Sequence, residues 1–239
     1  MLISHHCSGS LITKRYILTA AHCLTGKVPD QYTLSGVRLG EWDKSTNPDC
    51  ISDINNNEFC AGLHIDLPIE KVIVHENYNA NDINQYHDIG LIRLSRNIDF
   101  TSWIQPICLP LEDHLRSMTH FNETLTISGW GKTENSKNSN RQLKADIRIV
   151  EIDTCNSKYN DFNITVSNNQ LCAGGVIGTD TCNGDSGGPL IAVNNLPNYE
   201  YFIAGIVSYG PSPCALENWA GVYTNVAKYL DWILKNIEP

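Results

Sequence analysis

Short apolar segments separated by turn residues recur from one end of the chain to the other, and this pattern limits the fold more than any other feature. The segments are rich in Val, Ile, Leu and Tyr, which favour strands, and Gly, Pro, Asn and Asp lie between them. The predicted strands span residues 9–12, 16–19, 33–39, 69–75, 89–94, 125–130, 143–150, 190–193, 201–207 and 221–225. Short strands and turns at this spacing are typical of an all-β barrel or sandwich.

Two segments depart from the strand pattern. Residues 20–24 predict a single helical turn. Residues 226–237 predict a C-terminal helix, because apolar side chains recur there with a period of about 3.6. These side chains belong to Val226, Tyr229, Leu230, Ile233, Leu234 and Ile237. Two polar stretches, 43–61 and 133–140, are expected to be surface loops.

The chain is predicted to form one domain over residues 1–239. All-β barrels of this length commonly form a single unit, and the sequence contains no internal repeat and no clear linker. No apolar run approaches the length of a membrane span. The formal net charge of −9 disfavours nucleic acid as a partner, because phosphate binding relies on Lys and Arg. We therefore expect neither a nucleic-acid nor a membrane partner.

Nine cysteines are spread along the chain without the close pairs that zinc sites use. Dispersed cysteines predict disulfides and an oxidising compartment, and the odd number leaves one cysteine free or bonded to another chain. The sequons at Asn122 and Asn163 agree with secretion and predict glycosylation. Residues 1–12 have neither the basic nor the long apolar region of a signal peptide, so we expect the sequence to be a piece of a longer secreted protein.

Three short motifs carry the chemistry. Gly-Asp-Ser-Gly-Gly-Pro at 184–189 offers a serine nucleophile among small residues, which let backbone N–H groups approach a developing oxyanion. A serine hydroxyl needs a base to become nucleophilic. Leu-Thr-Ala-Ala-His-Cys at 18–23 supplies a histidine, and Asp-Ile-Gly-Leu-Ile at 88–92 supplies an acid. Each motif alone would more often be a turn, a structural histidine or a strand end, but together they provide nucleophile, base and orienting acid.

The three motifs resemble the chymotrypsin family of serine proteases, which has the chain order histidine, aspartate, serine. The resemblance extends from about Cys7 to the C-terminal helix. Further matches are Gly-Trp-Gly at 129–131, Pro-Ile-Cys-Leu-Pro at 106–110, Cys-Ala-Gly at 172–174, Ser-Tyr-Gly at 208–210 and Gly-Val-Tyr-Thr at 221–224. The resemblance implies two six-stranded antiparallel β-barrels with a C-terminal α-helix, of which the first strand is missing here, and it implies no required cofactor.

The resemblance also assigns catalytic roles. Ser186 would attack the scissile carbonyl, His22 would take the serine proton and pass it to the leaving amine, and Asp88 would orient the imidazole. The N–H groups of Gly184 and Ser186 would form the oxyanion hole.

Cleavage after Arg or Lys is the specificity that the resemblance implies. Asp180 matches the acid at the floor of the trypsin pocket, where a carboxylate pairs with a guanidinium or ammonium group. Gly210 and Gly221 would keep this pocket open. Ser208 and Tyr209, together with Gly210, would form a strand that pairs with the substrate backbone. The sequence leaves the choice between Arg and Lys open.

The cysteines can be assigned in part by the same resemblance. The family pattern implies the disulfides Cys7–Cys23, Cys155–Cys172 and Cys182–Cys214. Cys50 and Cys60 lie in one polar loop and are expected to pair, which leaves Cys108. In the family, a cysteine at this place often bonds to one in a light chain or clip domain.

Residues 38–43 and 47–50, with the additional Cys50–Cys60 loop, resemble the catalytic domains of arthropod clip-domain proteases. Those enzymes act in extracellular zymogen cascades of immunity, melanisation and Toll activation. The resemblance therefore implies a downstream zymogen as the protein substrate and a serpin as the inhibitor. Glu41 matches a calcium-loop position of related enzymes. With Asp43 it is a candidate ligand for a structural calcium ion, which needs several oxygen ligands, and the alternative is a solvated acidic loop.

One part of the family pattern is broken. Active members begin with Ile-Val-Gly-Gly, and the new amino group pairs with the acid before the serine, here Asp185. The sequence contains no such stretch, and an unpaired buried carboxylate is costly. We therefore expect this polypeptide by itself to be zymogen-like.

The sequence allows two other interpretations. A non-catalytic binding module is known among clip-domain homologues that have lost their triad, but the complete set of catalytic and pocket residues argues against it. A metal site at His5, His6 and Cys7 is the other. The implied disulfide of Cys7 argues against that site.

Overall fold

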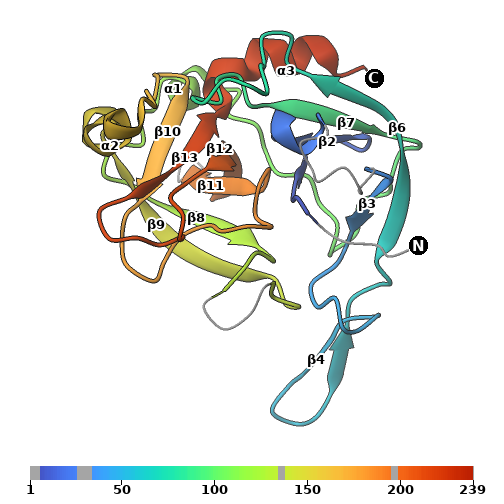
Figure 1. The fold of residues 1–239 in the computed structure, drawn as a ribbon. Coiled ribbons are helices and arrows are strands. Elements are labelled where there is room, and N and C mark those ends of the chain that lie inside the picture. The colour runs from blue at the N-terminus through green and yellow to red at the C-terminus, as the bar shows by residue number, and fades with distance from the viewer. Residues whose placement is uncertain (1–5, 26–33, 134–137, 195–198, 239) are drawn as a thin grey trace.

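The protein is described here by a computed structural model that covers residues 6–25, 34–133, 138–194 and 199–238. Two β-structures lie side by side, and the C-terminal helix lies across the top of the view (Figure 1). This arrangement confirms the predicted all-β class with a C-terminal helix. No helix within the described residues is long and apolar enough to cross a membrane.

The C-terminal half forms a closed antiparallel barrel with the strand order β10-β13-β12-β11-β8-β9. Its strands are β8 (Thr124–Gly129), β9 (Leu143–Val150), β10 (Gln170–Gly174), β11 (Pro189–Asn194), β12 (Glu200–Tyr209) and β13 (Ala220–Asn225). Buried and less buried residues alternate along β8, as expected when one face of a strand points into a core. All of β13 is buried, so this strand lies between the barrel core and a covering layer.

The N-terminal half forms a five-stranded antiparallel sheet with the order β1-β2-β7-β6-β3. Its strands are β1 (Ser10–Leu11), β2 (Tyr16–Thr19), β3 (Gly36–Leu39), β6 (Ile65–Val74) and β7 (Gly90–Leu94). Among the described residues this sheet does not close. That agrees with the expectation of a six-stranded barrel without its first strand.

A hairpin of β4 (Cys50–Ser52) and β5 (Glu58–Cys60) projects from the N-terminal half (Figure 1). The sequence predicted only a loop over 43–61, so the two strands were missed. Cys50 pairs with Cys60 in the strand register and is also bonded to it, which holds this short hairpin together. Asn and Asp dominate the intervening residues, and these types are depleted in strands.

The helical elements are short. They are the 3₁₀ turns η1 (Ala21–Cys23), η2 (Asn160–Phe162) and η3 (Val226–Tyr229) and the helices α1 (Asp113–Arg116), α2 (Ile152–Tyr159) and α3 (Leu230–Asn236). The predicted helix over 226–237 therefore begins as a 3₁₀ turn. The sequence did not predict α1, α2 or β10.

One core cluster joins the two halves. It combines Leu18 and Leu91 of the N-terminal sheet with Ile206 of the C-terminal barrel, and all three are fully buried. Leu230 and Ile233 of α3 pack into the same cluster. The C-terminal helix thus packs where the two halves share a core.

Candidate active site

His22 and Asp88 meet because their strands are paired. Thr19, the last residue of β2, lies opposite Gly90, the first residue of β7. The turn η1 then places His22 beside Asp88, which lies two residues before β7. His22 Nδ1 lies 2.8 Å from Asp88 Oδ2, and the His22 backbone N–H donates to Asp88 Oδ1 at 2.9 Å. The carboxylate therefore fixes both the ring and the turn that carries it.

Asp88 is fully buried and receives further hydrogen bonds from the C-terminal barrel. Ser208 Oγ on β12 donates to Asp88 Oδ2 at 2.5 Å. Thr224 Oγ1 on β13 donates to the Asp88 carbonyl at 2.7 Å. A buried carboxylate needs such donors. Sequence reasoning gave Ser208 a substrate-binding position and Thr224 no role, although the Gly-Val-Tyr-Thr motif contained it.

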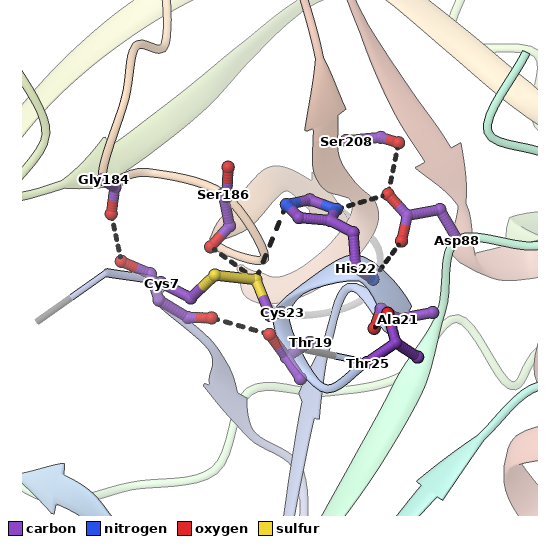
Figure 2. Close-up of a disulfide and its surroundings, with 11 residues drawn as sticks. Cys7, Thr19, Ala21, His22, Cys23, Thr25, Asp88, Gly184, Ser186 and Ser208 are labelled. Carbon is purple, nitrogen blue, oxygen red and sulfur yellow. Dashed lines mark hydrogen bonds and ion pairs between the residues drawn. A yellow bond between two sulfur atoms is a disulfide. The ribbon is translucent and has the colours of Figure 1, made fainter. Parts of the chain in front are cut away.

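Ser186 lies on the other side of His22 from Asp88 (Figure 2). Its carbonyl accepts a hydrogen bond from the Ser8 N–H at 2.7 Å. No hydrogen bond joins Ser186 Oγ to His22 within the described part of the chain. His22 Nε2 is instead 3.7 Å from Cys23 Sγ. Catalytic hydrogen bonds are often loose without substrate, so this arrangement is compatible with a nucleophile and its base.

Some backbone N–H groups around Ser186 donate hydrogen bonds within the protein and others do not. The N–H groups of Asp185, Gly187 and Gly188 donate to backbone carbonyls. Those of Gly184 and Ser186 donate to no acceptor in the described residues. Gly187 must be glycine, because its φ is +78° and a Cβ would lie 2.5 Å from the Ser8 carbonyl oxygen. The turn thus leaves free the two N–H groups that the resemblance assigns to an oxyanion hole.

Four disulfides brace the site and its surroundings. They join Cys7 to Cys23, Cys50 to Cys60, Cys155 to Cys172 and Cys182 to Cys214, as expected from the sequence. The Cys7–Cys23 bond holds the turn that carries His22 (Figure 2). Cys108 is free and exposed. The alternative metal site at His5, His6 and Cys7 lacks a thiolate, because Cys7 is bonded to Cys23. His5 lies outside the described residues.

Asp180 lies beside two glycines of the C-terminal barrel. A Cβ on Gly221 would lie 3.2 Å from Asp180 Oδ1, and one on Gly174 would lie 3.7 Å from it. The carboxylate accepts hydrogen bonds from the backbone N–H groups of Thr181 at 2.8 Å and Ala215 at 3.4 Å. Burial raises the pKa of Asp180 to about 6.

Gly210 and Gly221, which the resemblance assigns to the substrate pocket, lie next to each other. Gly210 faces Gly221, since a Cβ on Gly210 would lie 3.7 Å from the Gly221 Cα. No cationic side chain forms an ion pair with Asp180 in the described ranges. Asp180 is therefore a carboxylate without an ion-pair partner among the described residues.

Asp185 is 9% exposed, and its carboxylate accepts hydrogen bonds from residues of the C-terminal half. Its Oδ1 accepts from the Gly131 N–H at 2.8 Å, and its Oδ2 accepts from the Cys182 N–H at 3.0 Å. Burial raises the pKa of the carboxyl above its ordinary value. No ion pair to Asp185 occurs among the residues that the structure describes. This is the position where the resemblance expects a cationic amine.

The candidate calcium ligands face cations of the protein itself. Glu41 Oε2 accepts from Arg38 at 3.1 Å, and Asp43 Oδ2 accepts from Arg141 at 2.8 Å. Asp49 accepts from backbone N–H groups, and Asp53 closes its own turn with Asn57. Glu41 Oε2 and Asp43 Oδ2 are thus each paired with a guanidinium group, whereas Glu41 Oε1 is buried without a hydrogen-bond partner in the described residues. A calcium ion at this loop stays a prediction.

The predicted glycosylation residues lie on the surface. Asn122 and Asn163 are both exposed, and both have a positive φ, of 63° and 58°. Neither side chain makes a hydrogen bond within the described residues. Each amide nitrogen is therefore accessible in the folded protein.

Comparison with known proteins gives a consistent set of relatives. A family model described as trypsin matches residues 2–233. "Serine protease ea" of Drosophila melanogaster is 50% identical over 236 residues, which cover 98% of this chain and 60% of that protein. "Melanization protease 1" of the same fly is 46% identical over 234 residues, covering 98% and 58%. "Spaetzle-processing enzyme" of Drosophila melanogaster is 42% identical over 237 residues, which cover 98% of this chain and 59% of that protein.

A solved structure agrees with these relatives. The Drosophila Grass clip serine protease of the Toll pathway superposes with a TM-score of 0.82 at 38% identity, covering 95% of this chain and 62% of that one. The chain thus spans about three fifths of the length of the proteins it matches. These matches confirm the resemblance to clip-domain proteases that the sequence motifs indicated.

Proposed function

Because the chain belongs to the trypsin family of serine proteases, we propose that it is the catalytic domain of an extracellular endopeptidase that cleaves after Arg or Lys. The observation that carries this proposal is the pocket acid. Asp180 is partly buried beside Gly174 and Gly221, without a cationic partner in the described residues, and a substrate guanidinium or ammonium would supply that partner.

The geometry supports an acyl-enzyme mechanism. His22 Nε2 would take the proton of Ser186 Oγ as the serine attacks the scissile carbonyl carbon. The free N–H groups of Gly184 and Ser186 would bind the resulting oxyanion. His22 would then give its proton to the leaving amine, and water would hydrolyse the acyl-enzyme by the same steps. Asp88 holds the ring in the required orientation throughout.

The relatives support a place in an insect zymogen cascade. Their names include a melanization protease and a Spaetzle-processing enzyme, and the solved structure is a Toll-pathway protease. We propose a downstream zymogen as the substrate, a serpin as the inhibitor, and a light chain or clip domain bonded through the exposed Cys108.

A direct test uses the full-length processed protein with a fluorophosphonate probe and a peptide library. We expect labelling that is lost in Ser186→Ala, and cleavage only after Arg or Lys. A binding module without catalysis would not react with the probe. Labelling without cleavage after basic residues would refute the specificity while leaving the serine hydrolase chemistry intact.

A further inference from the structure

Asn163 is a modifiable residue at an unusual place. It follows η2 directly and has left-handed backbone geometry, with φ 58° and ψ 27°. Its backbone N–H bonds to the Asn160 carbonyl, whereas its side chain is exposed and makes no hydrogen bond in the described part of the chain. With Ile164 and Thr165 it forms a sequon. The folded surface therefore leaves room for a glycan at this amide.

On one side, Asn163 adjoins aromatic residues that lead to the substrate strand. The ring of Phe162 lies edge-on to Trp219, with centroids 5.6 Å apart. Tyr159 contacts Trp219 at 5.4 Å and Tyr209 at 5.8 Å. Tyr209 is the last residue of β12 and directly follows Ser208, which bonds to the catalytic Asp88. Two aromatic rings, those of Trp219 and Tyr159, thus lie between the Phe162 ring and Tyr209.

On the other side, the sequon is tied to the segment that leads into Asp88. Thr165 donates its N–H to Asn84 Oδ1 at 2.7 Å and accepts from Tyr86 Oη through its carbonyl, also at 2.7 Å. Tyr86 precedes Asp88 by two residues. The sequon therefore lies where segments of the two halves meet at the edge of the active site.

We propose that Asn163 carries an N-linked glycan that stands at this edge and restricts which macromolecules can enter the active site. The inference rests on the extracellular location proposed above, because the modification belongs to the secretory pathway. Asn163 Nδ2 bonds to the anomeric carbon of a lipid-linked oligosaccharide. The bond from that carbon to the lipid diphosphate breaks, the diphosphate leaves, and the amide loses a proton.

The expected effect depends on the size of the reactant. A short peptide that fills only the Asp180 pocket does not extend to Asn163, so the glycan leaves its cleavage unchanged. A folded inhibitor presents a wide surface and meets the glycan during docking. Steric restriction of docking acts on the association rate constant, which can vary by one to about three decades among related complexes.

Asn122 provides a matched control on the same chain. It is also exposed, also has a positive φ and also opens a sequon. It lies just before β8, whereas Gly129 ends β8 close to the carboxylate of Asp185. A six-residue strand spans roughly 20 Å, so a glycan on Asn122 lies at the far end of this strand from the active site.

The test compares the secreted full-length protein with Asn163→Gln, Thr165→Ala, Thr165→Ser and Asn122→Gln. Mass spectrometry before and after peptide N-glycosidase reports whether Asn163 is modified. We expect a glycan in the wild type and in Thr165→Ser and none in the first two variants. Thr165→Ala leaves Asn163 itself unchanged, so its result does not depend on how glutamine tolerates a positive φ.

Inhibition kinetics then report on access. With the glycan absent from Asn163, association of a folded serine-protease inhibitor is expected to rise about tenfold, while kcat/KM on an Arg-amide peptide stays constant. Asn122→Gln is expected to change neither value. An unmodified Asn163, or equal inhibition rates with and without the glycan, overturns the inference. Failure of the fluorophosphonate probe to label the wild type refutes the proposed function instead, and the mass measurement still stands.

Discussion

Asp180 holds a negative charge where burial disfavours it. Hydrogen bonds from two backbone N–H groups lower the pKa of Asp180. Desolvation raises the pKa by a larger amount, so the pKa rises to about 6. An acid with a raised pKa in the folded state stabilises the fold below its ordinary pKa of 3.8, and this contribution is lost as the pH rises through about 6. Stability and the proposed recognition of a basic side chain are therefore in opposition at this residue.

Replacing the Asp180 carboxylate with a neutral amide separates its effect on stability from its effect on cleavage. We predict that Asp180→Asn unfolds at a higher temperature than the wild type at pH 7.5, because the buried charge is gone. Cleavage after Arg is expected to fall by about 10⁴-fold, as for sites that lose a matched polar partner. Calorimetry and peptide kinetics on the processed enzyme measure both. A lower melting temperature for Asp180→Asn would contradict the account of burial.

The same carboxyl predicts a pH dependence of ligand binding. Benzamidine carries a fixed positive charge, and it should bind the ionised form of Asp180. Its Kd is therefore expected to be constant above about pH 7 and to rise up to about tenfold per unit below pH 6. Calorimetric titration across this range checks the slope. Asp180→Asn should bind weakly and without this slope.

Single residues with chemical roles could be predicted from the sequence where a motif surrounds them. Ser186, His22, Asp88 and Asp180 each lie in or near such a motif, and the structure places the first three together. Thr224 could not be assigned, because its bond to the Asp88 carbonyl links residues on different strands. Only the folded chain brings these two atoms within reach.

At the scale of elements, strands with regular apolar character were predicted well. The bounds of β2 and β9 agree with the predicted ranges. The missed β10 has the sequence Gln-Leu-Cys-Ala-Gly, without a β-branched residue, and it is a strand because it pairs with β13 along its whole length. The β4–β5 hairpin was missed because a disulfide and register hold it, rather than strand propensity.

The disulfides predict different consequences for different elements. Cys182–Cys214 closes a loop of 32 residues and Cys50–Cys60 one of 10. Chain entropy gives each bond about 3 to 4 kcal/mol at most. We predict that Cys50→Ala/Cys60→Ala leaves benzamidine binding unchanged, because the hairpin projects away from the body of the protein. Cys182→Ala/Cys214→Ala should weaken binding at least tenfold, since both segments contact Asp180. Equal loss in both double variants would refute this distinction.

At the scale of the whole molecule, the segment before β9 connects the two halves. Arg141 pairs with Asp43, and the Trp130 indole N–H donates to the Trp42 carbonyl at 3.1 Å. Residues 42–43 follow β3 of the N-terminal sheet, and residues 130–133 and 138–141 belong to the C-terminal half. Gly131 in this segment also donates to Asp185. The contact between the halves is therefore also a support for the turn that carries Ser186.

The Asp43–Arg141 pair predicts an acid-sensitive contact. The hydrogen bond from Arg141 lowers the pKa of Asp43 to about 2. A lowered pKa stabilises the folded state above the ordinary value of 3.8, and the stabilisation is lost as the pH falls through about 2. Asp43→Asn is therefore expected to melt below the wild type at pH 7, with the difference shrinking toward pH 2. Arg116→Ala, which removes the exposed pair with Asp231, is the control and should change little. A difference that does not vary with pH would contradict this role of the pair.

The protonation state of Asp185 depends on whether an ammonium group is docked beside it. Its pKa is raised while backbone N–H groups are its only donors in the described residues. Any ammonium group that docks beside it would lower that pKa and displace a bound proton. Below the raised pKa, docking of such a group should therefore acidify an unbuffered solution, and the uptake of acid should in turn oppose docking. A proton and an ammonium group therefore compete for the same carboxyl group, and a pH electrode can measure the proton released when the ammonium group docks.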